Sequence, residues 1–326
     1  MQVHQKRLAL AAWVGALLLG CGKLPGNEYE MPGPCTVLCN TAAGPALAAV
    51  WGSGASDVWA VGGNGTILHW NGSAWSSVSS GTTIQLRGVW GAGASDVWAV
   101  GDGGTILHWD GSAWSSVYSA TTIQLRGIWG ASANDIWAVG DSGVVKHWDG
   151  SAWRSVIPLV YQSLSLNSVS GTGPSDVWAV GSSPYITILH WDGSTWSSIA
   201  PPQPDLQFAS VWAISLKDVW AVGSNTASYQ PIAFHWDGGS WSIVPLGTTT
   251  YGLGGVWASG ASDVWAVGTG DTLHWDGTVW SSVPSGASNT LWGVWGSGSS
   301  DVWAVGESSA TVQHWNGRGW SSSSYP

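Results

Sequence analysis

Two side-chain types that can move protons recur at fixed places along the chain. Every histidine beyond residue 20 stands in the string His-Trp-(Asp/Asn)-Gly, and an aspartate opens each copy of a second string, Asp-(Val/Ile)-Trp-Ala-Val-Gly. The seven histidines are His69, His108, His147, His190, His235, His274 and His314, and the seven aspartates are Asp57, Asp96, Asp135, Asp176, Asp218, Asp263 and Asp301. An imidazole and a carboxylate could serve as general base and acid in a hydrolytic site.

Seven equal copies of a proton donor would be superfluous for catalysis. Outside the repeat, the sequence shows no set of His, Asp and Glu that resembles a triad or a paired acid and base. We therefore predict that the chain is not an enzyme and expect structural roles for both residues. The aspartate should accept hydrogen bonds from its own turn, and the histidine should donate a ring N–H to a backbone carbonyl of a neighbouring strand.

Metal chemistry has little support in the sequence. Acidic residues follow some of the Val-Gly pairs, at Asp102, Asp141, Asp271 and Glu307, but one carboxylate per repeat is too few for calcium. Cys35 and Cys39 lie in a Pro/Gly-rich stretch without nearby histidine, short of the four ligands of a zinc site. In an oxidising compartment these two cysteines could form a small disulfide. We expect no metal and no cofactor.

The strings belong to a repeat that fills most of the chain. Successive copies of the aspartate string begin 39, 39, 41, 42, 45 and 38 residues apart. Seven copies of about forty residues match the blades of a β-propeller, which hold four short strands each. In the second copy the strands are expected at 86–91, 96–101, 105–109 and 113–117, separated by Gly-rich or Asp-Gly turns. The sequence predicts an all-β, seven-bladed propeller of four-stranded antiparallel blades.

The same repeat also predicts how tryptophan packs and how the ring closes. Tryptophan occupies four fixed positions per copy, with one exception at Ser170, and so constant a register indicates packing between blades. The first strand-one run (46–52) and the last strand (319–323) lie in different copies. Each blade is therefore expected to be one continuous segment, with no strand exchanged between the first and last blades.

The N-terminus has the features of a processing signal. Lys6 and Arg7 precede an apolar run from Leu8 to Leu19, and Leu18-Leu19-Gly20-Cys21 resembles the bacterial lipobox. That resemblance implies cleavage before Cys21 and lipid attachment to its thiol, and Gly22 favours the outer membrane or cell surface. We predict a lipoprotein signal peptide at 1–20, a flexible tether at 21–45 and the propeller at 46–326. The lipid anchor is then the expected membrane contact.

The repeat resembles several propeller families. The turn Asp110-Gly111-Ser112-Ala113-Trp114 looks like a degraded Asp-box of the sialidase type, although His-Trp replaces the Ser/Thr before the aspartate. Trp-Ala-Val-Gly-x-x-Gly-Thr-Ile-Leu is similar to photosystem II stability-factor-like repeats. With the lipobox, the chain looks like the Trp-rich propeller lipoproteins of myxobacteria. WD and kelch repeats differ, since the Gly-His dipeptide and the double-Gly strand are missing.

Loop lengths point to one face for binding. The turns between strands one and two and between strands three and four keep one length, whereas the connections from strand two to three and from strand four to the next blade vary. In a four-stranded blade both variable connections lie on one face, and loops often carry binding residues. Tyr118 and Phe208 fall in these connections, and the predicted ligand-binding residues, which centre on blades four and five, are Tyr161, Tyr185, Asn225, Tyr229, Gln230 and Tyr251.

The leading hypothesis is a monomeric recognition module for a glycan or protein. The alternative is a structural or assembly scaffold of an envelope complex. A sialidase-like glycosidase is the weakest hypothesis, since it would need clustered arginines, whereas Arg87, Arg126, Arg154 and Arg318 stand in different copies. Nucleic acid is excluded as a partner, because the nine basic residues are scattered and the formal net charge is −10.

Overall fold

The computed structural model describes residues 45–156, 164–182, 188–201, 203–247, 251–270, 272–307 and 312–325. The predicted signal peptide and tether, with Cys21, Cys35 and Cys39, lie outside this part of the chain, as do Tyr161 and Tyr185. Within the described ranges, none of the helical turns has the length or apolar character of a membrane-crossing helix.

Seven groups of four strands follow one another along the chain. The first blade holds β1 (Leu47–Gly54), β2 (Asp57–Gly62), β3 (Ile67–Trp70) and β4 (Trp75–Ser77); the second holds β5 (Leu86–Gly93), β6 (Asp96–Gly101), β7 (Ile106–Trp109) and β8 (Trp114–Ser116). The third holds β9 (Leu125–Ser132), β10 (Asp135–Gly140), β11 (Val145–Trp148) and β12 (Trp153–Ser155); the fourth holds β13 (Ser165–Gly173), β14 (Asp176–Ser182), β15 (Ile188–Trp191) and β16 (Trp196–Ile199).

The last three blades repeat the pattern. The fifth holds β17 (Leu206–Ser215), β18 (Asp218–Asn225), β19 (Pro231–Trp236) and β20 (Trp241–Ile243); the sixth holds β21 (Tyr251–Gly260), β22 (Asp263–Thr269), β23 (Thr272–Trp275) and β24 (Trp280–Ser282); the seventh holds β25 (Leu291–Gly298), β26 (Asp301–Gly306), β27 (Val312–Trp315) and β28 (Trp320–Ser322). Short 3-10 turns, η1 (Gly63–Gly65), η2 (Asp102–Gly104) and η3 (Asp141–Gly143), connect the second and third strands of the first three blades.

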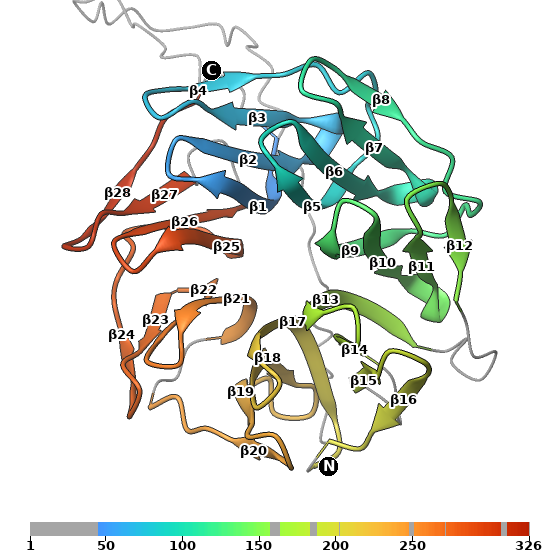
Figure 1. Ribbon diagram of the computed structural model, residues 1–326. Coiled ribbons are helices and arrows are strands. Elements are labelled where there is room, and N and C mark those ends of the chain that lie inside the picture. Colours follow the sequence, from blue (N-terminus) through green and yellow to red (C-terminus); the bar gives the residue numbers. More distant parts are fainter. Residues whose placement is uncertain are drawn as a thin grey trace, which may run out of the picture. The chain divides into compact units, whose positions relative to one another are not determined.

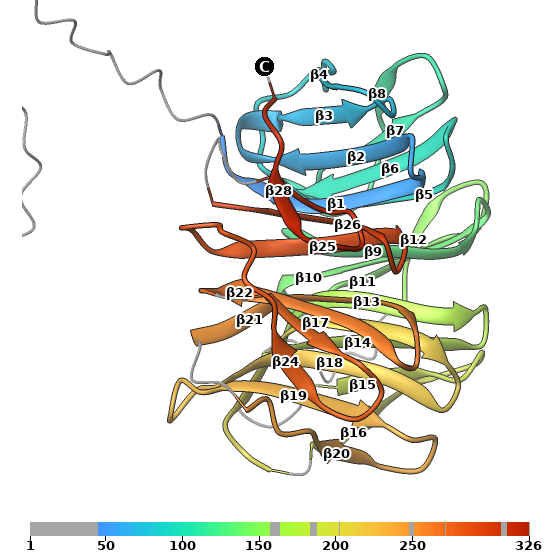
Figure 2. The same ribbon diagram turned by 90° about the vertical axis from the view of Figure 1, so that its left-hand side faces the viewer.

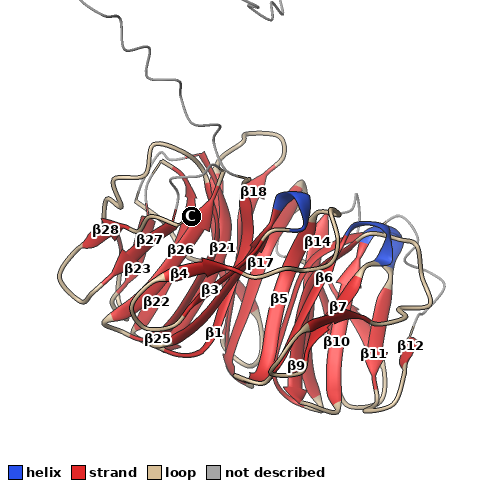
Figure 3. Cartoon of the chain, turned by 90° about the horizontal axis from the view of Figure 1, so that it is seen from above, coloured by secondary structure: helices blue, strands red, loops and turns tan. Residues whose placement is uncertain are grey.

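Each group pairs antiparallel in chain order, and the groups form a ring. The first strand of every blade lies nearest the centre (Figure 1), and seen from the side the blades lie in successive layers (Figure 2). Colouring by secondary structure shows that strands make up most of the described chain (Figure 3). One backbone pairing, Ser182 with Gln207, also links the fourth and fifth blades into a continuous sheet. The predicted propeller of four-stranded antiparallel blades is confirmed.

Tryptophan packing holds neighbouring blades together. Trp59 of β2 lies against Trp109 and Trp114 of the second blade, with ring centroids 5.1 and 5.5 Å apart. The same wedge recurs where the last blade meets the first, since Trp303 lies 5.1 Å from Trp70 and 5.3 Å from Trp75. Strand two is buried on both faces because neighbouring blades cover both sides of it.

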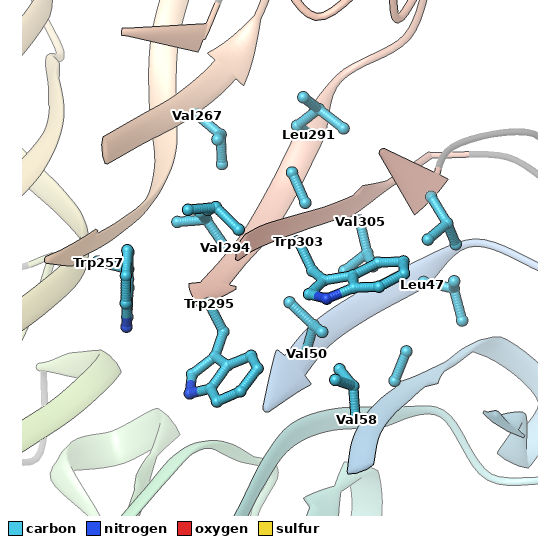
Figure 4. Packing of buried hydrophobic residues seen from close by; sticks show 14 of the residues in the cluster. Leu47, Val50, Val58, Trp257, Val267, Leu291, Val294, Trp295, Trp303 and Val305 are labelled. Carbon is cyan, nitrogen blue, oxygen red and sulfur yellow. The ribbon is translucent and has the colours of Figure 1, made fainter. Parts of the chain in front are cut away.

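The ring closes without an exchanged strand, as expected. β1 pairs with β2 of its own blade, and β28 pairs with β27 of its own blade. Figure 4 shows the side chains that join the two blades, with Trp303, Val305 and Leu291 of the last blade packed beside Leu47 and Val50 of the first. The Tyr325 hydroxyl also donates to the Pro45 carbonyl, at 3.4 Å.

The structure corrects one placement on the variable connections. Phe208 lies inside β17, is fully buried and meets Phe234 edge to face at 5.3 Å. The strand begins at Leu206, earlier than the repeat indicated, so Phe208 belongs to the core.

Candidate functional site

The two faces of the ring differ in the way predicted from loop lengths. In the second blade, Leu86 at the start of strand one pairs with Gly101 at the end of strand two. Val100 pairs with Ile106 at the start of strand three, and Leu107 beside it pairs with Ser116 at the end of strand four. The two variable connections therefore meet at one face, called here the variable face, and the two constant turns meet at the opposite, constant face.

A hydrogen-bonded network of Asp, His and Trp repeats around the constant face. In the first blade His69 Nε2 lies 2.6 Å from Asp57 Oδ1, and Trp59 Nε1 donates to the same oxygen at 3.2 Å. The imidazole also stacks on Trp59, with centroids 4.1 Å apart. All seven His–Asp pairs are present, at 2.6–2.8 Å. The expectation that histidine bonds a backbone carbonyl was wrong, because its ring nitrogen reaches the carboxylate on the adjacent strand.

The order of the groups in this network does not suit a serine nucleophile. Ser53 Oγ donates to Asp57 Oδ2 at 2.5 Å, so the carboxylate lies between the hydroxyl and the imidazole. Nucleophilic catalysis requires the imidazole between the hydroxyl and the carboxylate. The arrangement instead holds the carboxylate ionised. At Asp176, Asp263 and Asp301 burial acts to raise the pKa, but the hydrogen bonds from histidine and Ser/Thr outweigh it and lower the pKa.

The aspartate after His-Trp shapes the turn between strands three and four. Asp110 accepts from the Ser112 hydroxyl at 2.6 Å and from the backbone N–H groups of Ser112 and Ala113. These bonds, the Ser112 hydroxyl first, lower the pKa of Asp110 to about 2. Asn71 takes the same place and accepts the same bonds in the first blade. The residues that resemble an Asp-box thus close a turn.

The first strands of the blades enclose a central channel with a volume of about 380 Å³. Strand one of most blades carries Leu-x-x-Val at or near its start, as in Leu86-Arg87-Gly88-Val89. At the variable-face end of the channel, each blade contributes the second residue of this motif or its equivalent. Around the ring these residues are Ala48, Arg87, Arg126, Asn167, Ala209, Gly254 and Trp292. A sevenfold backbone therefore presents an asymmetric set of side chains at this mouth.

The two arginines form a connected polar network. Arg87 donates from Nε and Nη2 to the two oxygens of Asp102, at 2.5 and 3.2 Å, and Arg126 binds Asp141 in the same way at 2.7 and 3.2 Å. With its amide oxygen turned toward the guanidinium groups, Gln124 accepts from Arg126 at 2.9 Å and from Arg87 at 3.2 Å. Burial acts to raise the pKa of Asp141, but its bonds with Arg126 outweigh that effect and lower it. Both arginine side chains stay about one-third exposed, and both line the channel.

The opposite part of the mouth is apolar and open. The indole of Trp292 is 37% exposed, and the blades beside it carry Gly254 and Ala48 at the same position. Guanidinium groups and an amide thus occupy three adjacent blades, and small residues with one indole occupy the other four. An extended ligand could bind its polar and apolar groups to different parts of this mouth.

Three of the residues predicted to bind ligand form one hairpin on the variable face. The Asn225 side chain accepts hydrogen bonds from the backbone N–H groups of Ala227 and Ser228. The backbone N–H of Asn225 donates to the carbonyl of Gln230. Asn225 therefore shapes the loop, whereas Tyr229 is 74% exposed, with φ of 58°. Tyr251 begins β21, and its backbone pairs with Thr269.

The channel-mouth residues Arg87, Arg126 and Trp292 were missed from the sequence. The sequence showed these arginines in different copies of the repeat, but not that Arg87 and Arg126 share a position beside the channel. Comparing the copies at the residue after the conserved Leu of strand one would have shown that this position alternates among Ala, Arg, Asn, Gly and Trp. Tyr118, noted in a variable connection, is 85% exposed.

No protein-family model and no curated protein matches the chain. Among solved structures it is similar to YCF48 from Cyanidioschyzon merolae, with 18% identity and a TM-score of 0.65 over 82% of this chain and 94% of that one. A structure of YCF48 bound to D1 peptide matches with 15% identity and a TM-score of 0.64 over 82% and 90% of the two chains. An inactive virginiamycin B lyase from Staphylococcus aureus with quinupristin matches with 13% identity and a TM-score of 0.70 over 83% and 94%. These likenesses show the fold alone.

Proposed function

We propose that this chain is a non-catalytic recognition module that binds a segment of a partner protein across its variable face. The observation that carries the proposal is the asymmetric set of side chains at the channel mouth. A ligand without sevenfold symmetry needs such a surface, and most of the blade scaffold repeats too regularly to provide one.

The chemistry of the mouth suits a peptide. Each arginine presents a planar group with N–H donors, and Trp292 offers an exposed ring for an apolar side chain. Tyr229 and Tyr118 extend the exposed aromatic surface toward the rim of the same face. A similar fold is known in a structure of YCF48 bound to D1 peptide, so a propeller of this kind can hold a peptide.

Peptides selected from a random display library against the wild-type propeller provide the probe. Their dissociation constants would be measured by calorimetry for Arg126→Gln, Trp292→Ala and Tyr229→Ala. Loss of a central anchor typically costs about 1–3 kcal/mol, so we expect roughly tenfold weaker binding for Trp292→Ala. Arg154→Gln is the matched control, because Arg154 forms a similar pair with Asp149 at 2.5 Å on the constant face.

Equal affinities for the wild type and all variable-face variants would contradict the proposal. So would a glycan array that gives saturable binders lost in Trp292→Ala while no peptide is selected, since the ligand would then be a sugar. The alternative function is that of a structural or assembly scaffold of an envelope complex. It predicts binding to folded partners but not to the isolated peptides.

The proposal includes export and lipid anchoring at the outer membrane or cell surface, in the manner of the Trp-rich propeller lipoproteins. It is supported by the lipobox-like Leu18-Leu19-Gly20-Cys21 after an apolar run. Wild-type protein should incorporate labelled palmitate and partition into detergent, and Cys21→Ser should do neither. Equal labelling of the two proteins would exclude the anchor without affecting the test of peptide binding.

A further inference from the structure

The other end of the channel is lined by tryptophans. Three residues beyond the mouth position, ~10 Å along each strand, the first strands place five indoles against the cavity. They are Trp51, Trp90, Trp129, Trp212 and Trp295, called here the indole collar. The collar lies toward the constant face, because strand one ends there in the tight turn to strand two.

Four of the five collar rings press on a glycine of the next blade, and beside the fifth, Trp212, the equivalent residue is Ala258. A Cβ atom placed on Gly91 would lie 2.5 Å from Cη2 and 2.7 Å from Cζ3 of Trp51, so the far edge of the indole presses on the glycine backbone. Gly52 receives Trp295 in the same way, where the last blade meets the first, and Figure 4 shows Trp295 beside the end of β1. Each of these four rings therefore spans the gap between two inner strands, and its distal edge is covered.

The ring faces are turned toward the channel. Trp212 and Trp257 occupy equivalent positions in successive blades, and their planes are inclined by 54°. That angle is close to one-seventh of a full turn, as expected for equivalent rings whose planes run along the channel axis. A ring that also reaches from its own strand to the glycine of the next blade, as Trp51 reaches Gly91, lies flat on the wall. Because an indole carries negative charge on its face and positive charge on its edge, flat rings attract a cation.

The surroundings have the same sign of potential. Each turn between strands one and two carries the network aspartate, and five of the turns between strands three and four carry another. In the described chain only Arg154, Lys217 and Arg318 supply basic charge on this face. Twelve carboxylates thus stand against three lysine and arginine side chains on this face. A channel that opens through such a surface concentrates cations at its entrance.

We infer that the constant-face end of the channel binds an organic cation of the alkylammonium class, held against the indole collar. The ligand is either a free ammonium compound or the lysine side chain of a partner. This site is separate from the peptide site proposed at the variable face, and neither depends on the other.

The test compares choline with dimethylbutanol, its uncharged carbon isostere, by saturation-transfer NMR on the full propeller. Choline should bind saturably, and the neutral isostere should bind at least about threefold more weakly. Trp90→Leu should weaken choline binding about threefold or more, and Trp90→Phe should lie between it and wild type. Trp292→Leu is the matched control, an indole removed from the opposite mouth, and should leave choline binding unchanged.

Competition by N-acetyl-lysine amide separates the two sources of the cation. Displacement of choline shows that a lysine side chain can enter, and failure to displace it assigns the site to small free ammonium compounds. Equal binding of choline and the isostere, no saturable choline binding, or equal losses in Trp90→Leu and Trp292→Leu would each overturn the inference. Trp90→Phe keeps the test available if Trp90→Leu does not fold.

Discussion

Ala120 occupies a backbone conformation that favours glycine. Its φ is +54°, and Gly81, at the same place in the preceding connection, has φ of +71°. The buried amine of Lys146 donates to the Ala120 carbonyl at 2.9 Å and to Ser155 at 2.8 Å, which holds the connection in place. No other copy has lysine at this strand-three position, where most carry an apolar residue.

Replacing Ala120 with glycine should stabilise the protein. The change removes the Cβ strain of the left-handed conformation and leaves the carbonyl bonded by Lys146 unchanged, so the free energy of unfolding should rise by about 0.5–1 kcal/mol. Gly81→Ala is the reverse experiment, because a Cβ there meets no neighbouring atom and only the φ angle matters. Urea titration measures both. A Gly81→Ala variant more stable than the wild type would show that the strain is negligible, because alanine also lowers the entropy of the unfolded chain.

The aspartates bonded to histidine make the stability of the fold depend on pH. Burial acts to raise the pKa of Asp263, but hydrogen bonds from His274 and Ser259 outweigh it, and the folded-state pKa lies below the unfolded value of about 3.9. The charged carboxylate therefore stabilises the fold fully above that unfolded value, and the contribution is lost as pH falls through the folded pKa.

Asp263→Asn should cost about 1–2 kcal/mol at neutral pH, because it removes the charge of a carboxylate that accepts hydrogen bonds from His274, Ser259 and Trp265. The difference from wild type should shrink below pH ~4. Chemical denaturation at several pH values measures it. A difference that stays constant down to strong acid would mean that the carboxylate's charge is not what matters.

Residue roles were the part of the site that the sequence predicted least well. The repeat positions of histidine and aspartate were plain, but their pairing depends on strands two and three lying side by side with Trp59 opposite His69. The Arg87 and Arg126 network likewise requires knowing that strand one lines a channel. Only the assembled ring brings residues from successive blades to one mouth.

At the scale of single strands, the glycine that follows the tryptophan of strand one determines how closely two neighbouring blades can approach. A Cβ on Gly91 would lie 2.5 Å from Trp51 and 2.8 Å from the Asp96 carbonyl. In the fifth blade this position is Ala213, and the preceding blade has Ser170 in place of tryptophan; the serine hydroxyl accepts from the Ala213 N–H at 3.1 Å. Where the other blades place an indole, Ser170 thus makes a hydrogen bond to the next blade. Alanine is not specific to this junction, because Ala258 holds the same position beside Trp212.

Gly91→Ala should destabilise the propeller by about 1–3 kcal/mol, because Trp51 must move away from its packed position. Gly93→Ala, two residues along the same strand, provides the comparison, since a Cβ there meets nothing within 4 Å. Thermal unfolding followed by circular dichroism distinguishes them. Equal melting temperatures for the two variants would show that the collar can move without cost.

Strand positions were predictable to within about two residues because Trp and Gly mark them in every copy. Phe208 was the exception. The fifth blade begins its first strand two residues early and uses phenylalanine where other blades use leucine, so a residue assigned to a loop is core. The extra length also allows the pairing of Ser182 with Gln207, which no repeat comparison would indicate.

At the scale of the whole molecule, the blade count and ring closure followed from seven equal copies. The asymmetry of the ring did not, because it depends on single side chains that the repeat leaves free to vary. Ala48, Asn167 and Trp292 share one backbone position and have nothing chemical in common. The residues that determine the fold and those proposed to bind the ligand are thus different residues of the same strand.

The junction between the last and first blades has a consequence for the order of the chain. It uses the same tryptophan wedge as the other junctions, and the Tyr325 hydroxyl already reaches the Pro45 carbonyl. A circular permutant, with 325 joined to 45 by a short Gly-Ser linker and new ends opened at Gly81, should fold to the same ring with a similar urea midpoint. Failure of that permutant to fold would show that the natural break is required. If it folds, the second blade can begin the polypeptide as well as the first, and the position of the chain ends is not what closes the ring.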